Sequence, residues 1–181
     1  MNKYISILRG INVSGQKKIK MADLTALYQN LGLSDVVSYI QSGNLIFNSS
    51  VDNITELKSS LEQAISQQYG FDVPVEIRTQ NQFCQVLSQL PFQDIVLEQD
   101  GSKVLVTFLS AKPCEVNISE LLKHVSAPER LVVSDQIVYL HCPNGYGRSK
   151  LSNVFIEKKL KLIATTRNLK TVSKLVELSS S

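Results

Sequence analysis

The stretch VVSYIQSGNLIFN, residues 36–48, holds two runs rich in β-branched and aromatic side chains, separated by a short polar segment that contains glycine. Two such runs around a glycine turn predict a β-hairpin. With the turn centred on residues 42–43, Tyr39 would pair with Ile46. The hairpin decides the fold, because the segments on both sides of it can then be assigned as strands and helices of one sheet.

The segments around the hairpin complete the order β-α-β-β-α-β. A buried strand is predicted at residues 4–9, and a helix at residues 21–31, where apolar side chains recur at helical spacing. A second helix over residues 53–70 would end at Gly70, and residues 73–79 alternate as a strand does. This is the ferredoxin-like order, in which two helices cover one face of an antiparallel sheet.

The second half of the chain repeats this pattern. The order β-α-β-β-α of residues 103–161 matches that of residues 4–69 element for element, which indicates an internal duplication. We therefore predict an α+β fold of two tandem ferredoxin-like (βαββα) subdomains with antiparallel sheets. The first would span residues 1–80. The second would span residues 81–181, with a linking helix at its start and a final helix near residues 168–178.

Charge is spread unevenly along the 181 residues, whose net charge is only +3. Residues 1–22 carry +5 and residues 146–174 carry +7, whereas residues 23–145 carry −8. Such asymmetry indicates an anionic partner. The alternative is that the two basic segments are solvated and never meet in space.

The composition is that of an ordinary globular protein, with 43% hydrophobic residues. The three cysteines (84, 114 and 142) are far apart and form no CxxC, so neither a disulfide framework nor a metal site is expected, and no cofactor is implied. No run approaches the roughly 20 apolar residues of a membrane span, and the N-terminus lacks the features of a signal peptide. We expect a cytoplasmic protein with no membrane partner.

The loop RGINVSGQKKIK, residues 9–20, is the first candidate binding site. Gly10 and Gly15 have the spacing of a phosphate-binding loop, but the Lys and Ser/Thr that should follow are missing, so a Walker A motif is excluded. A looser anion site remains, with exposed backbone N–H groups and the cations Arg9 and Lys17. The alternative is a flexible, solvated basic loop.

The tip of the first hairpin is the second candidate. Gln41 and Asn44 would flank the turn with two side-chain amides, each able to donate and accept hydrogen bonds. Turn chemistry alone also explains this composition, and it is the favoured interpretation.

The stretch CPNGYGRSKLSN, residues 142–153, is the third candidate. Gly-Tyr-Gly resembles part of an RNA-reading RNP1 strand, but the required aromatic residues are missing and a proline precedes the glycines, so RNP1 is excluded. The stretch instead predicts a loop leading into a helix capped by Ser149 or Ser152. Arg148 would then add a bidentate contact to an anion and Lys150 a point charge. Simple capping with surface charge is the alternative.

The segment ATTRNLKTVSKLVEL, residues 164–178, is the fourth candidate. It is predicted as an amphipathic helix capped by a threonine, with Arg167, Lys170 and Lys174 on one face. A solvated basic face is the favoured interpretation. Arg167 would join a binding site if it lay close to Arg148.

No catalytic constellation is recognisable in the sequence. His124 falls in an apolar helix and His141 at the end of a strand, neither beside a nucleophile in a familiar setting. Cys142 adjoins His141, but neighbouring strand residues point to opposite faces, so the two would not cooperate directly. No catalytic residue is therefore assigned.

Four stretches resemble a known family: LRGINVSGQKKIKMADLTALYQNLG, DVVSYIQSGNLIF, GRSKLSN and ATTRNLKTVSKLVEL. By these the chain is identified as a member of the bacterial domain-of-unknown-function family 1697. Similar proteins usually have glycine where this chain has Ser14, and tryptophan where it has Leu169. The resemblance implies a pair of ferredoxin-like subdomains and brings no established activity or cofactor.

The leading functional hypothesis is binding of a phosphate-containing anionic ligand, a nucleotide or a nucleic-acid backbone, in a basic cleft between the two halves. One alternative is an enzyme acting on a small phosphorylated metabolite, and another is a protein–protein interaction module. The sequence assigns no oligomeric state. The residues predicted to bind the ligand are Arg9, Lys17, Gln41, Asn44, Arg148, Lys150 and Arg167.

Overall fold

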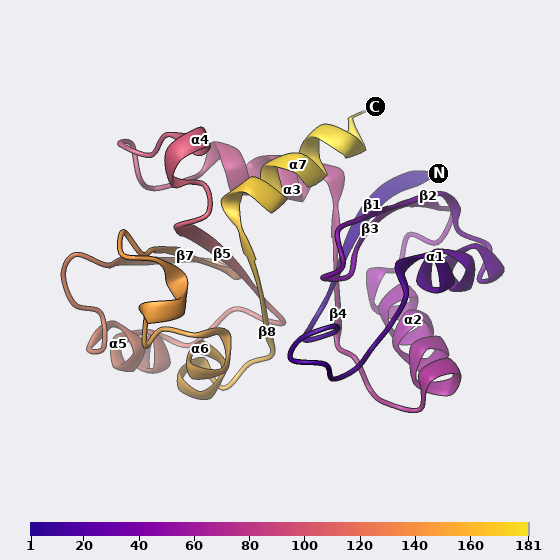
Figure 1. The fold of residues 1–181 in the computed structure, drawn as a ribbon, viewed down its shortest axis with the longest axis horizontal. Helices are drawn as coiled ribbons and strands as arrows, with labels where there is room; N and C mark the ends of the chain where they lie inside the picture. Colours follow the sequence, from indigo (N-terminus) through magenta and orange to yellow (C-terminus); the bar gives the residue numbers. More distant parts are fainter. Residues whose placement is uncertain (181) are drawn as a thin grey trace. The chain divides into compact units, whose positions relative to one another are not determined.

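The computed structural model describes residues 1–180 and confirms the α+β class (Figure 1). Within these residues the chain forms two four-stranded antiparallel sheets and seven α-helices. The two halves repeat the same order of strands and helices, and their sheets have the equivalent strand orders β2-β3-β1-β4 and β6-β7-β5-β8.

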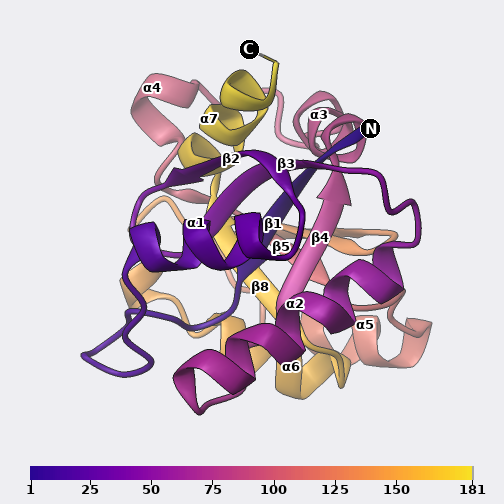
Figure 2. The ribbon, with the colours of Figure 1, turned by 90° about the vertical axis from the view of Figure 1, so that its right-hand side faces the viewer.

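The first sheet places its first strand at the centre, between β3 and β4. Two helices cover one face of this sheet, as Figure 2 shows for α1 and α2. The elements are β1 (Asn2–Leu8), α1 (Met21–Asn30), β2 (Ser34–Tyr39), β3 (Asn44–Ser49), α2 (Ile54–Tyr69) and β4 (Val75–Thr79).

The second sheet has the same arrangement, with β5 at its centre. Buried side chains from α5 and α6 pack together with side chains of β5 and β7 in one hydrophobic cluster, so both helices cover the same face. The elements are α3 (Gln80–Ser88), α4 (Leu97–Asp100), β5 (Val104–Leu109), α5 (Glu115–Leu122), β6 (Arg130–Ser134), β7 (Ile137–His141), the 3-10 helix η1 (Tyr146–Arg148), α6 (Asn153–Leu160), β8 (Ala164–Asn168) and α7 (Leu169–Ser179).

The chain divides into two compact units. Unit 1 comprises Met1–Gln85 and the chain from Leu175 onward, and unit 2 comprises Val86–Lys174. The division therefore falls inside helices α3 and α7. Each unit has its own sheet and its own pair of covering helices, and each is described by itself.

The core of unit 1 shows why its helices form where the sequence predicts them. Leu61 and Ile65 of α2 are fully buried on one stripe, and burial of each such side chain stabilises the fold by roughly 1.5–3 kcal/mol. Asn53 accepts hydrogen bonds from the first turn, and Gly70 ends the helix with a φ of 77°, in the left-handed region that glycine adopts readily. The predicted glycine stop is confirmed.

The predicted register of the first hairpin is wrong by two residues. Tyr39 pairs with Asn44 and not with Ile46, so residues 40–43 form a four-residue turn. The Asn44 side chain donates hydrogen bonds to the Tyr39 carbonyl and the Ser42 hydroxyl, both at 2.9 Å. Ile40 adopts a φ of 51° to close the turn. The amide of Asn44 thus stabilises a longer turn than glycine alone suggests.

The strand β8 was not predicted, and it changes the position of Arg167. The threonines expected to cap a helix lie in this strand, which pairs with β5. The helix α7 begins only at Leu169, where the side chain of Asn168 accepts a hydrogen bond from the backbone N–H of Thr171 at 2.9 Å. Arg167 therefore lies on a strand, and the prediction that it shares a helix face with Lys170 is wrong.

Candidate functional site

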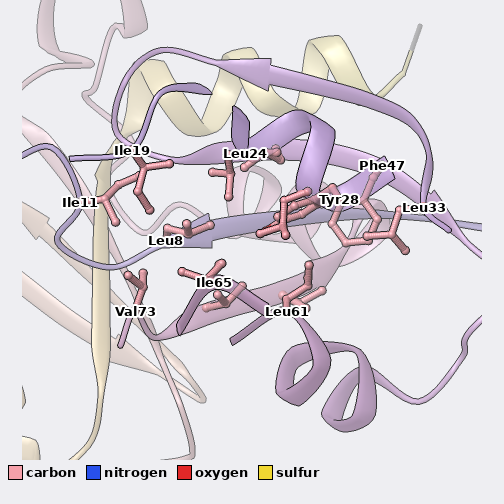
Figure 3. Packing of buried hydrophobic residues seen from close by; sticks show 14 of the residues in the cluster. Leu8, Ile11, Ile19, Leu24, Tyr28, Leu33, Phe47, Leu61, Ile65 and Val73 are labelled. Carbon is pink, nitrogen blue, oxygen red and sulfur yellow. The ribbon is translucent and has the colours of Figure 1, made fainter. Parts of the chain in front are cut away.

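The long loop between β1 and α1 is held in a defined conformation by its own side chains. Ile11 and Ile19 are buried and point into the same core as Leu8 of β1 (Figure 3). Asn12, with a φ of 55°, joins the two ends of the loop. Its amide donates to the Ile19 carbonyl and accepts from the Ile19 N–H, both at 2.9 Å. The loop is therefore a packed element of unit 1.

This loop is also joined to the tip of the first hairpin. The Asn12 amide donates to the Gln41 carbonyl at 2.7 Å. A Cβ atom added at Gly43 would lie 2.7 Å from Cδ1 of Ile11 and 2.8 Å from Cβ of Leu8, closer than real Cβ atoms approach other atoms. Glycine is therefore required for the loop to pack on the tip, and two of the predicted candidate stretches lie side by side.

The predicted binding residues of unit 1 differ in how their polar groups are used. The Lys17 ammonium donates to the backbone carbonyl of Asp72 at 2.6 Å, so it ties the loop to the segment between α2 and β4. Arg9 is half-buried, and its backbone N–H donates to the Pro74 carbonyl at 2.9 Å. Asn44 is buried and donates both amide hydrogens within the turn, whereas the side chain of Gln41 is exposed.

In unit 2, the chain after β7 forms a loop and a short 3-10 helix before α6. Gly145, with a φ of 93°, turns the chain into η1, and Tyr146 packs its half-buried ring against the core of the unit. The helix α6 starts at Asn153, where the predicted cap Ser152 accepts a hydrogen bond from the Phe155 N–H at 3.2 Å. The predicted cap is confirmed, but the loop cations precede the helix by several residues.

A hollow of about 300 Å³ lies beside this loop. Arg148 and Lys150 line it together, and both side chains are exposed. His124 and Glu129 line it as well, from the segment between α5 and β6. Within residues 1–180, neither Arg148 nor Lys150 forms an ion pair with a carboxylate. Two predicted residues are thus brought together at one concave surface, and their charges face solvent.

The sequence did not identify His124 and Glu129 as residues of this site. His124 lies just beyond the end of α5, and its ring contacts the Phe155 ring edge-on, with centroids 5.1 Å apart. Glu129 ends the turn before β6, where its N–H donates to the Ser126 carbonyl at 3.0 Å. No motif marks either residue, because the loops that carry them are distant in sequence from Arg148.

One cysteine, Cys142, lies close to Glu129 of the hollow. Cys142 is buried, and the nearby Glu129 carboxylate and Ser149 hydroxyl both affect the pKa of its thiol. Burial is the main reason that the pKa of the Cys142 thiol rises to about 11. A thiol that stays protonated is a poor nucleophile, so Cys142 has a structural role.

Arg167 has surroundings unlike those expected of a solvated helix face. Its guanidinium donates to the carbonyl of Thr166 at 2.9 Å, and desolvation lowers its pKa to about 10. The neighbouring Thr166 hydroxyl bonds to the hydroxyl of Thr107 at 2.7 Å and donates to the Asn153 side chain at 2.8 Å. Arg167 is not among the residues that line the hollow.

A second polar cluster of unit 2 ties the segment before α4 to the sheet. The Arg130 guanidinium binds both carboxylate oxygens of Asp94, at 2.9 and 3.0 Å, and donates to Nδ1 of His141. It also lies over the ring of Phe92, 4.7 Å from the centroid. Burial, followed by the nearby Arg130 charge, lowers the pKa of His141. This cluster, the Arg130 clamp, holds the segment before α4 against the sheet. The sequence did not predict it.

Two further findings concern the described part of the chain. Among residues 1–180, no three His, Cys, Asp or Glu side chains lie together as metal ligands would. Over the same residues, no helix combines the length and the apolar character needed to cross a membrane.

The fold and these loops define an α+β protein of two similar halves with a cation-lined hollow in the second. The chain belongs to the family described as protein of unknown function DUF1697, which matches residues 1–139. It is similar to a solved structure, that of the conserved bacterial protein SP0830 of Streptococcus pneumoniae. The two are 26% identical with a TM-score of 0.76, and the match covers 98% of each chain. No curated protein matches the chain.

Proposed function

We propose that this protein binds a phosphate-containing anionic ligand, and that the hollow of unit 2 is the place where it does so. The observation that carries the proposal is that Arg148 and Lys150 line the same concave surface. Within residues 1–180, neither forms an ion pair with a carboxylate. A guanidinium offers a fork that matches two phosphate oxygens, and an ammonium adds a compact charge.

The expected affinity is modest. Both cations are exposed, and in water-like surroundings two opposite unit charges 4 Å apart attract each other by only about 1 kcal/mol. Loss of one such contact would therefore weaken binding about fivefold, and added salt would weaken binding further. Asn144 also lines the hollow, and its side-chain amide would supply a neutral hydrogen bond.

Isothermal titration calorimetry tests the proposal. The wild-type protein is titrated with inorganic phosphate, a nucleoside monophosphate and a short oligonucleotide, at low and at high salt. We expect salt-sensitive binding that weakens about fivefold in Arg148→Ala. The control is Lys112→Ala, which removes an exposed cation of the same unit outside the hollow. Equal binding by both variants, or binding by none of the three ligands, would refute the proposal.

A second candidate function is an enzyme acting on a small phosphorylated metabolite. The observation in its favour is that the hollow holds two titratable side chains, His124 and Glu129, beside the two cations. A proton-transferring group close to a bound phosphate is what hydrolysis or transfer of the phosphoryl group requires. Release of phosphate from a panel of phosphate esters, lost in His124→Gln, would establish this function. Absence of turnover with every ester would exclude it for those substrates.

A further inference from the structure

The walls of the hollow carry charges of both signs. Arg148 and Lys150 contribute positive charge, and Glu129 is the one acid among the lining residues. A carboxylate repels a phosphate group, so Glu129 would weaken binding of a bare anion. Its presence at the site is explained if the ligand also brings hydrogen-bond donors, which a carboxylate binds strongly.

The carboxylate of Glu129 has capacity left for such donors. Glu129 is half-buried and lines the hollow, and its charge helps to raise the pKa of the Cys142 thiol. An ionised carboxylate offers about four acceptor positions. Glu129 forms no ion pair with any Lys or Arg of residues 1–180. No cation of these residues therefore takes up the acceptor positions of Glu129, which lines the hollow.

The size of the hollow restricts the ligand. Its volume of about 300 Å³ lies at the lower limit of the range for small-molecule pockets. That space is larger than one phosphate group needs. It suits a phosphate group with a few attached carbons and hydroxyls.

We infer that the hollow selects a small phosphate monoester that carries free hydroxyl groups, with Arg148 and Lys150 on the phosphate and Glu129 on the hydroxyls. This inference rests on the proposed phosphate binding and adds the class of ligand. The selectivity comes from the carboxylate, because the cations alone would accept any phosphate ester of suitable size.

Two ligands of nearly the same shape test the inference, glycerol 3-phosphate and n-propyl phosphate, which differ in two hydroxyl groups. We expect the wild-type protein to bind glycerol 3-phosphate about tenfold more tightly in calorimetry, since hydrogen bonds to a charged group are worth about that factor. In Glu129→Gln the ratio should fall toward one, while propyl phosphate binds as well as before or better. The control Glu98→Gln, an exposed acid of unit 2 outside the hollow, should keep the tenfold ratio.

The possible outcomes distinguish a failure of this inference from a failure of the proposed phosphate binding. Equal affinity of both esters for the wild-type protein, with Arg148→Ala still weakening both, would overturn the role of Glu129 and leave phosphate binding standing. Tighter binding of an oligonucleotide than of either ester would overturn the small-ligand class. Absence of binding by every probe would overturn both. The wild-type comparison of the two esters is decisive even if Glu129→Gln does not fold.

Discussion

Gly43 offers a test of how the loop and the hairpin tip of unit 1 fit together. In Gly43→Ala the new methyl group would stand 2.7 Å from Cδ1 of Ile11 and 2.8 Å from Cβ of Leu8. Leu8 lies in the central strand and both neighbours are buried, so neither can move aside freely. The substitution should displace the loop from the tip or strain both.

The loss of unfolding free energy in Gly43→Ala has two parts that can be measured separately. An L-residue at a φ of 77° costs roughly 1–2 kcal/mol relative to glycine, and overpacking of a filled core typically costs roughly 1–3 kcal/mol more. Gly70 has the same φ of 77°, but nothing lies within 4 Å of its added Cβ. Gly70→Ala therefore measures the backbone cost alone. Both glycines belong to unit 1, so the two variants report on the same folded unit.

Urea unfolding followed by circular dichroism gives the free energy of unfolding of each variant. We expect Gly43→Ala to lose roughly 1–3 kcal/mol more than Gly70→Ala, because only the first adds the steric clash. Equal losses for the two variants would show that the loop does not pack on the tip as described. A smaller loss at Gly43 than at Gly70 would contradict the reasoning outright.

Two further predictions follow from the polar groups of unit 2. Burial and the Arg130 charge hold the pKa of His141 below its ordinary value of 6.5, so its contribution to stability is complete above pH 6.5 and is lost as the pH falls through the folded-state pKa. Between pH 7.5 and pH 5 the thermal unfolding temperature should therefore fall less in His141→Gln than in the wild type. Identical falls would count against the Arg130 clamp. The Cys142 thiol, with its pKa near 11, should react far more slowly with a thiol reagent at pH 8 than the exposed Cys114. The rates can be read separately from the double variants Cys84→Ser/Cys114→Ser and Cys84→Ser/Cys142→Ser, which each keep one thiol. Comparable rates would show that Cys142 is not buried.

Much of the fold was predictable from local patterns. The apolar stripe of α2 and its glycine stop at Gly70 both follow from residues within one or two helical turns. The repeat of one element order in both halves then defined the α+β class before any contact was known.

The candidate site was predictable only in part. Glycine loops and charge identified Arg148 and Lys150, because those features stand next to one another in the chain. The other wall of the hollow comes from His124 and Glu129, and their approach depends on how α5 and β6 pack against the loop after β7. A sequence pattern has no means of bringing such residues together.

The sequence by itself determined most of the segments that become strands and helices, since periodicity, caps and glycine stops act over a few residues. Only the tertiary structure decided the register of the first hairpin, whose tip packs against Leu8 and Ile11, and the existence of β8, which the pairing with β5 stabilises. The tertiary structure also decided which charges share a surface. These outcomes depend on contacts between residues far apart in the chain, and such contacts form only when the sheet and its helices have packed.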